Sequence, residues 1–364
     1  MSGPALVDWG LAGRVAETVA EVRGIPGRDR PSPLYTAADV EAATADALVV
    51  AADYAGLGTV EAPPPVELVG RGAWARGALR TLSDAAGPLE RRLGEDVALP
   101  EPLGGIARRA IGGAIGTEAG LAAGYAARRV LGQLDVPLFG ADRPARLVFV
   151  GENLEAARRE LRADSDLFLR WIALHESTHV IQFERVPWLV EHLRKSISAL
   201  IEGAAEEVRA ASLGGLGRRL VSDPRELVEA LLRGELARAI ALPEQGELLD
   251  RIQATMATVE GHAEHVMDVC ARKSDPALDA LRGRLDERRA RRGGLSELLG
   301  RLVGVELKLR QYELGKAFFD TIAADGGAEL VRLPWRSEAD LPTLPELERP
   351  RAWLERVGTA SAAA

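Results

Sequence analysis

The segment that could do chemistry is His175-Glu176-x-x-His179, in which two histidines lie four residues apart. On an α-helix this spacing places both imidazoles on one face, one turn apart, so both can reach a single metal ion. Glu176 is rotated by about 100° from His175. It therefore flanks the metal, where a general base for metal-activated water is needed. The alternative is a pair of surface histidines beside a solvated glutamate. The pattern predicts a zinc site with a hydrolytic function.

A third ligand is expected on a second helix, because catalytic zinc sites use three protein ligands and leave one position for water. Glu260 lies in a helical segment with Glu264 one turn further on. Glu260 would complete a His-His-Glu site, and Glu264 would accept a hydrogen bond from the outer N–H of a ligand imidazole. His262 and His265 are the alternative third ligands. His262 projects about 200° from Glu260 on an ideal helix, so we expect only one of these two residues to bind the ion.

The remaining histidine, His192, follows Pro187 in a separate helix. We interpret it as a surface or helix-capping residue, with a role in the active site as the alternative. Cys270, the single cysteine of the chain, has apolar neighbours and is expected to be a buried, unreactive thiol. One cysteine excludes an internal disulfide and suits a reducing compartment.

Two histidines with a downstream glutamate resemble the ligand set of the gluzincin metallopeptidases. The run Glu260-Gly261-His262-Ala263 resembles the Glu-Gly-x-Ala segment of the gluzincin aminopeptidases, whose glutamate is the third ligand. The whole chain resembles the zincin 2 family of zinc-dependent hydrolases, which is associated by pathway context with deazaflavin-coenzyme biosynthesis. The matching segments are 7–9, 130–135, 147–153, 171–188, 260–268, 308–312 and 341–343.

This resemblance implies a zincin-like fold, a bound zinc ion and a hydrolase of the metallopeptidase type. It also implies a donor for the oxyanion that develops on the substrate. The candidates are Lys308, Arg310 and Tyr312, of which we favour Tyr312, and a core tyrosine with a satisfied hydroxyl is the alternative for that residue. In zincins an edge strand beside the active-site helix pairs with extended substrate. The run 147–150 is the candidate for that strand, with an ordinary core strand as the alternative.

The elements that must position these residues are mostly helices. Asp164 or Ser165 is expected to cap the start of the helix that carries the motif. Pro187 is expected to end it, because proline cannot continue the backbone hydrogen bonds. Apolar spacing predicts helices over 7–22, 36–54 with Thr36 as N-cap, 74–93, 110–131, 166–184, 188–211, 224–232, 246–272, 276–292 and 305–324. Short β-type runs occur at 138–140 and 146–151. With the resemblance, this predicts a predominantly α (α+β) fold, a zincin-like metalloprotease core with a small β element and extra helices.

Composition argues against several kinds of partner. The net charge is −8, whereas nucleic-acid binding needs a basic surface. The stretch 110–131 is rich in small residues, but Glu118 lies in its middle and arginines lie at both ends, so it is not expected to span a membrane. The first residues lack the basic and apolar regions of a signal peptide. We expect a cytoplasmic protein that binds neither nucleic acid nor membrane.

The expected organisation is an N-terminal helical region over 1–134, a metal-binding core over 135–345 with inserted helices around 202–249, and a partly frayed tail over 346–364. A single compact unit is the alternative. The predicted function is zinc-dependent hydrolysis of a peptide or amide bond. Two alternatives remain open: a non-catalytic, zinc-stabilised binding or scaffold protein, and a zinc amidohydrolase that acts on a small metabolite.

Overall fold

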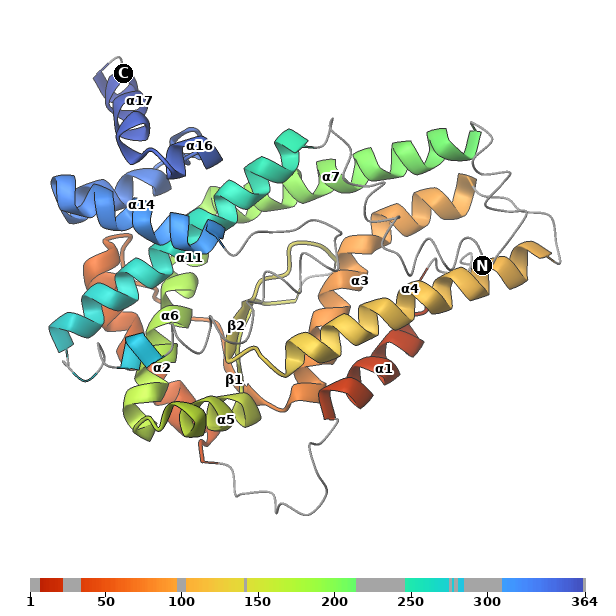
Figure 1. The fold of residues 1–364 in the computed structure, drawn as a ribbon, viewed down its shortest axis with the longest axis horizontal. Coiled ribbons are helices and arrows are strands. Elements are labelled where there is room, and N and C mark those ends of the chain that lie inside the picture. The colour runs from red at the N-terminus through yellow and green to blue at the C-terminus, as the bar shows by residue number, and fades with distance from the viewer. Residues whose placement is uncertain are drawn as a thin grey trace.

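A computed structural model gives the arrangement of the chain (Figure 1). It describes residues 7–21, 34–96, 103–140, 143–213, 246–274, 277, 281–284 and 310–362. Its helices are α1 (Trp9–Glu21), α2 (Ala37–Ala55), α3 (Arg71–Asp96), α4 (Leu103–Ala127), α5 (Gly151–Leu161), α6 (Ser165–Arg185), α7 (Pro187–Leu213), α11 (Gly246–Ser274), α14 (Arg310–Gly326), α15 (Ala328–Arg332), α16 (Leu344–Leu347) and α17 (Pro350–Ala362), with short 3-10 helices at Leu333–Trp335 and Glu338–Asp340. Its strands are β1 (Val66–Val69), β2 (Gly132–Asp135) and β3 (Arg146–Val150). The predicted class, predominantly α with a small β element, is confirmed.

The local signals for helix ends are confirmed in two places. The Thr36 hydroxyl accepts from the Asp39 N–H at 3.2 Å, and the Asp39 carboxylate accepts from the Thr36 N–H at 2.8 Å. This reciprocal pair is a capping box, which satisfies backbone donors at the start of α2. At α6 the Asp164 carboxylate caps the first turn. The helix ends at Arg185, and Pro187 then begins α7, where its missing N–H has no cost.

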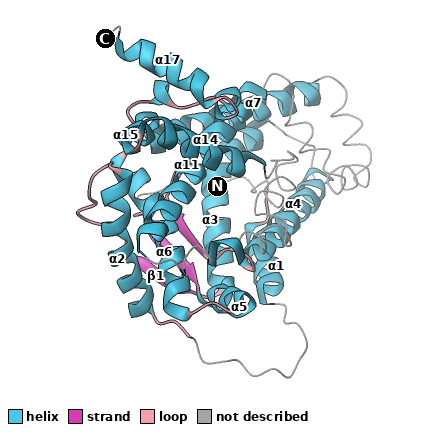
Figure 2. Cartoon of the chain, turned by 60° about the vertical axis from the view of Figure 1, so that its left-hand side comes forward, coloured by secondary structure: helices cyan, strands magenta, loops and turns pink. Residues whose placement is uncertain are grey.

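The three strands form a sheet of order β1-β3-β2, in which β1 is parallel and β2 antiparallel to β3. Figure 2 shows these strands enclosed by helices. Leu147 and Phe149, which share one face of β3, are fully buried in a cluster with residues of α2 and α6. The expectation that 147–150 offers an edge to substrate is therefore wrong, because β3 is the central strand. The edge strand in contact with α6 is β2.

The sequence patterns did not predict strands β1 and β2, and they predicted one strand that is absent. The run 138–140 is not a strand, whereas β1 and β2 are. Strand β2 reads Gly132-Gln133-Leu134-Asp135, and glycine and aspartate are depleted in strands. Its pairing with β3, with Gly132 opposite Phe149 and Asp135 opposite Arg146, is a long-range contact that overrides this local preference.

The core that supports the motif helix is built from both halves of the chain. One hydrophobic cluster joins Ala47 of α2, Phe149 of β3, Ile181 of α6 and Met267 of α11. The predicted boundary between 134 and 135 falls inside β2. A second cluster joins α11, α14 and α17 through Phe318, Phe319 and Trp353. Trp353 is fully buried, so the C-terminal helix is packed at this point. The predicted helix over 224–232, and most of the one over 276–292, lie outside the described residues.

Small residues in α4 have a packing role. A Cβ atom at Gly120 would lie 2.5 Å from the Ala12 carbonyl oxygen, and one at Gly124 would lie 2.6 Å from Val19 Cβ. Only glycine allows α4 to approach α1 this closely.

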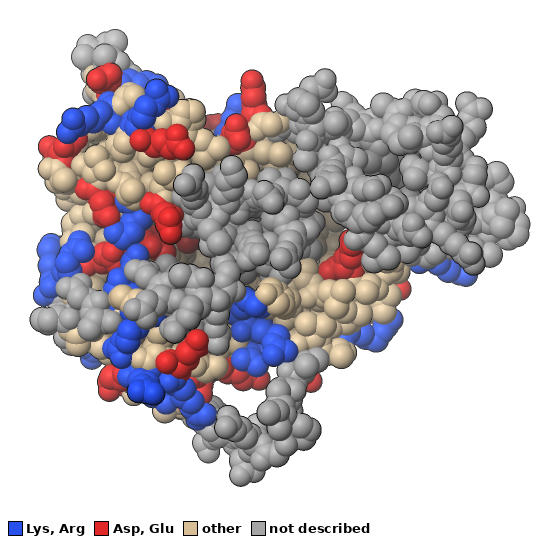
Figure 3. All heavy atoms as spheres, viewed as in Figure 1, with Lys and Arg blue, Asp and Glu red and all other residues tan. Residues whose placement is uncertain are grey.

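None of the helices in the described ranges is sufficiently long and apolar to cross a membrane. Basic and acidic side chains are interspersed over the described part of one face (Figure 3).

Candidate metal centre

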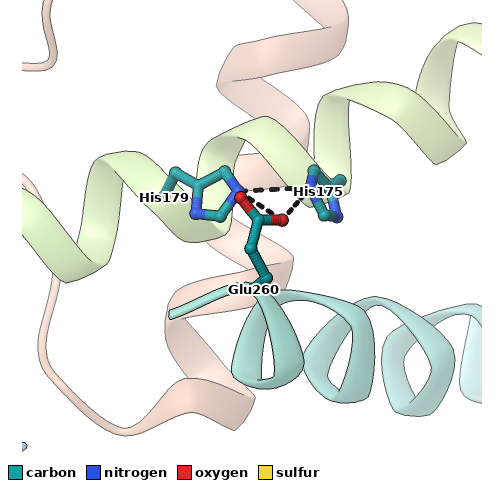
Figure 4. A group of neighbouring side chains, drawn as sticks. All are labelled: His175, His179 and Glu260. Carbon is teal, nitrogen blue, oxygen red and sulfur yellow. Dashed lines mark hydrogen bonds and ion pairs between the residues drawn. The ribbon is translucent and has the colours of Figure 1, made fainter. Parts of the chain in front are cut away.

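Helices α6 and α11 bring three ligand-type side chains together (Figure 4). His175 and His179 lie one turn apart on α6, with their Nε2 atoms 3.1 Å from each other. Glu260 reaches them from α11, and its Oε2 lies 3.5 Å from His175 Nε2 and 3.6 Å from His179 Nε2. The side chains are 15%, 9% and 25% exposed, respectively. The three predicted ligands therefore converge at one largely buried point.

The donor set and its spacing fit zinc. Two imidazole nitrogens and a carboxylate oxygen are ligands that zinc commonly takes in catalytic sites. Bonds of about 2.0–2.2 Å in a tetrahedral site separate the ligand atoms by about 3.3–3.6 Å. The separations of 3.5 and 3.6 Å fall in that range, and the His175–His179 separation of 3.1 Å is slightly shorter. Three protein ligands also leave a fourth position for water or substrate.

The electrostatics of the cluster favour positive charge beside Glu260. Burial opposes the charged form of Glu260, but the charges and hydrogen bonds of His179 and His175 hold the pKa of this carboxyl well below its usual range. Burial also opposes a charged His179, but Glu260 overcomes this effect and raises the pKa of the imidazole to about 9. The carboxylate is thus stabilised by positive charge at the point where the metal would bind.

Glu176 lies next to the ligands but is not one of them. Its side chain is buried, and this burial raises the pKa of the carboxyl above its usual value, an effect that His175 and His179 partly offset. Gly132 of β2 makes room for it: a Cβ atom at this position would lie 2.7 Å from Glu176 Cγ. The carboxyl of the predicted base is therefore held between the motif helix and the edge strand.

Gln182 is a residue of the site that the sequence reasoning missed. It is fully buried on α6, one turn after His179, and its Oε1 lies 2.9 Å from His179 Nδ1. This is the contact that we expected Glu264 to make. A signal was present, because Gln182 is a polar residue in the apolar run Ile181-Gln182-Phe183, three positions beyond a ligand.

Comparisons with known proteins agree with this geometry. A profile of the zincin-like metallopeptidases matches residues 7–354. The chain belongs to the zincin-like metallopeptidase family. Its structure is similar to the crystal structure of a proposed hydrolase with a novel fold from Chloroflexus aurantiacus, with 25% sequence identity, a TM-score of 0.67, and coverage of 97% of this chain and 99% of that chain. No curated protein is significantly similar in sequence.

Membership of the zincin-like family implies a metal ion, and the cluster of His175, His179 and Glu260 is the candidate for its site. Of the other predicted site residues, Glu264 does not join the cluster. The Glu264 carboxylate lies 2.9 Å from Arg282 in an ion pair. Tyr312 belongs to α14, but its side chain lies outside the described residues, so its role as oxyanion donor stays a prediction.

The alternative ligands among the histidines have other contacts. His262 is fully buried, with its Nδ1 2.9 Å from Gln182 Nε2, and burial lowers its pKa well below the usual value. His265 lies between Tyr54 and Asp320. The interpretation of His192 as a surface residue is wrong, because it is only 3% exposed. Its Nε2 lies 3.0 Å from the hydroxyl of Thr255 on α11. This hydrogen bond connects α7 to α11.

Proposed function

We propose that this chain is a zinc-dependent hydrolase that cleaves peptide bonds, with Glu176 as the general base. The observation that carries the proposal is the convergence of His175, His179 and Glu260 at zinc-ligand spacing, with the Glu176 carboxyl beside them. Zinc, when bound, would polarise the scissile carbonyl and make a water molecule more acidic.

The chain's own catalytic contribution is proton transfer by Glu176. Its carboxyl is buried, and its pKa is raised by that burial, which makes it a stronger base than an ordinary exposed carboxylate. In the proposed reaction Glu176 takes a proton from the attacking water. It then delivers that proton to the leaving amine, so the residue returns to its starting state. Tyr312 remains the candidate donor to the developing oxyanion.

Strand β2 supports a peptide as the substrate. Within the described residues it pairs on one side only, with β3, and its Gly132 faces the Glu176 side chain. An extended peptide can add to such an edge through backbone hydrogen bonds. A peptide bound in this way would run alongside β2, so one of its backbone carbonyls would pass Glu176.

A small-metabolite amide is the second candidate substrate. The burial of the ligands, with His179 only 9% exposed, favours a substrate that needs little space. A zinc-stabilised scaffold without turnover is the third candidate, and a buried base beside the metal ligands argues against it. The single, buried cysteine supports the proposal of a reducing, cytoplasmic location.

The test is metal content and cleavage of a peptide library by wild type and by Glu176→Gln. We expect about one zinc per chain in both proteins, because Glu176 is not a ligand, and a loss of about 100- to 10,000-fold in turnover in the variant, the range for a lost acid–base group. Full activity in Glu176→Gln, or a wild type that binds no zinc, would contradict the proposal. Cleavage of small acyl-amides alone would indicate the metabolite enzyme, and zinc without any cleavage would indicate the scaffold.

A further inference from the structure

Gln182 makes three hydrogen bonds with its single side-chain amide. Its Oε1 faces His179 Nδ1 at 2.9 Å, and its Nε2 faces both the Val259 carbonyl and His262 Nδ1, each at 2.9 Å. The side chain is fully buried between α6 and α11. We propose that Gln182 is the positioning residue that fixes the metal-binding form of His179 and ties it to the turn of α11 that carries Glu260. This inference rests on the metal site of the proposed function.

The orientation of the Gln182 amide follows from its partners. The Val259 carbonyl can only accept a hydrogen bond, so the amide nitrogen must face it. The amide oxygen then faces His179, and because that oxygen can only accept, Nδ1 of His179 must carry a proton. Nε2 is therefore the nitrogen left for a metal, and it points toward His175 and Glu260. An amide in the opposite orientation would place an oxygen against the Val259 oxygen.

The same amide connects the two helices that supply the ligands. Val259 immediately precedes Glu260, so the bond from Gln182 to the Val259 carbonyl holds the backbone turn from which the third ligand projects. His262 supports the far side of the amide. Its ring packs between Phe319 and Trp335, with centroid distances of 5.1 Å to each. The amide is thus fixed at all three of its contacts.

His175 gives the contrast on the same helix. Its Nδ1 is buried and has no hydrogen-bond partner within the described part of the chain. Of the two imidazoles, it is His179 whose ring orientation is set by a side chain. Outer hydrogen bonds of this kind orient ligand imidazoles, and their loss typically weakens metal binding by about 10- to 100-fold.

The experiment compares Gln182→Leu and Gln182→Glu with the control Thr178→Val. Thr178 is also buried on α6, but its hydroxyl donates to the Leu174 carbonyl of its own helix. Zinc affinity is measured by chelator competition, without substrate. We expect about 10- to 100-fold weaker binding in Gln182→Leu, and an affinity near that of wild type in Thr178→Val. Gln182→Glu keeps an acceptor for His179 but places an oxygen against the Val259 carbonyl, so we expect its affinity to lie between those of wild type and Gln182→Leu. A merely structural role predicts the reverse order, since a buried charge would disturb packing more than leucine does.

A second measurement is independent of zinc and of catalysis. In metal-free protein labelled with ¹⁵N-histidine, we expect a slowly exchanging Nδ1–H resonance of His179 in wild type and Gln182→Glu, and its loss in Gln182→Leu. Wild-type affinity in Gln182→Leu, or a wild type without this resonance, would overturn the inference. If wild type bound no zinc but showed the resonance, the proposed function would fail while the role of Gln182 in holding His179 would stand. If Gln182→Leu did not fold, the wild-type resonance and the Gln182→Glu affinity would still decide.

Discussion

Helix α11 contributes to two partly buried clusters of imidazole and carboxylate groups, and they differ in how the ring nitrogens are used. In the candidate metal centre, Nδ1 of His179 is hydrogen-bonded to Gln182, and its Nε2 points toward His175 and Glu260. Five residues beyond Glu260, His265 uses both nitrogens within the protein: Nδ1 lies 2.7 Å from Asp320 and Nε2 lies 2.8 Å from the Tyr54 hydroxyl.

The charged side chains of the second cluster also form several ion pairs with one another. Lys316 lies 2.5 Å from Asp320 and 3.1 Å from Asp268, and Arg282 pairs with Asp268. Burial opposes ionisation of Asp320, but hydrogen bonds from His265 and Lys316 lower the pKa of this carboxyl to about 2. His179 is held by Gln182 through Nδ1, so its Nε2 is left for an ion. His265 has protein partners at both nitrogens, so it connects helices instead.

The largest expected effect is a loss of zinc binding that follows a substitution in one of the two clusters on α11 and not in the other. Glu260→Ala removes a ligand and should weaken zinc binding by more than about 100-fold, beyond the range for outer hydrogen bonds. His265→Gln should keep one zinc per chain, because His265 has no part in the site. Elemental analysis after dialysis measures both. Zinc retained in Glu260→Ala and lost in His265→Gln would reverse the assignment.

A smaller effect is expected from Gly132→Ala, which changes the metal centre without altering a ligand. The new Cβ would lie 2.7 Å from Glu176 Cγ, so the base must move. A displacement of about 1 Å can cost about 100-fold in rate, and we expect a loss of this order in turnover with zinc content unchanged. Gly151→Ala is the control, because its Cβ would meet Leu68 at 3.4 Å, an ordinary contact. Equal activity of both variants would show that Glu176 does not need its present position.

The smallest expected effect concerns the second cluster, which surrounds His265. Tyr54→Phe removes one hydrogen bond from His265 and should lower the free energy of unfolding by about 1 kcal/mol. Urea denaturation measures this change, and chelator competition should show an unaltered zinc affinity. A drop in zinc affinity without a change in stability would mean that the two clusters are coupled, contrary to the comparison.

Much of the site could be predicted because its central signals are local. The spacing of His175 and His179 fixes their relative position on any helix, and the capping residue Asp164 with Pro187 marks the ends of that helix. These interactions join residues a few positions apart, so they do not depend on the rest of the fold. In the same way, Thr36 as an N-cap residue predicted where α2 begins.

The partners of that helix were decided by the tertiary structure. The sequence offered Glu260, His262 and His265 within six positions, and which of them meets the histidines depends on how α11 is rotated against α6. Gln182 received its role from the Val259 carbonyl, 77 residues away. Strand β2 became the edge beside Glu176 although its residues do not favour a strand. The sequence by itself determined the arrangement of the candidate ligands His175 and His179 and of Glu176, because helical spacing is a short-range property. The third ligand position, the anchoring amide and the edge strand depend on long-range packing, which local spacing does not encode.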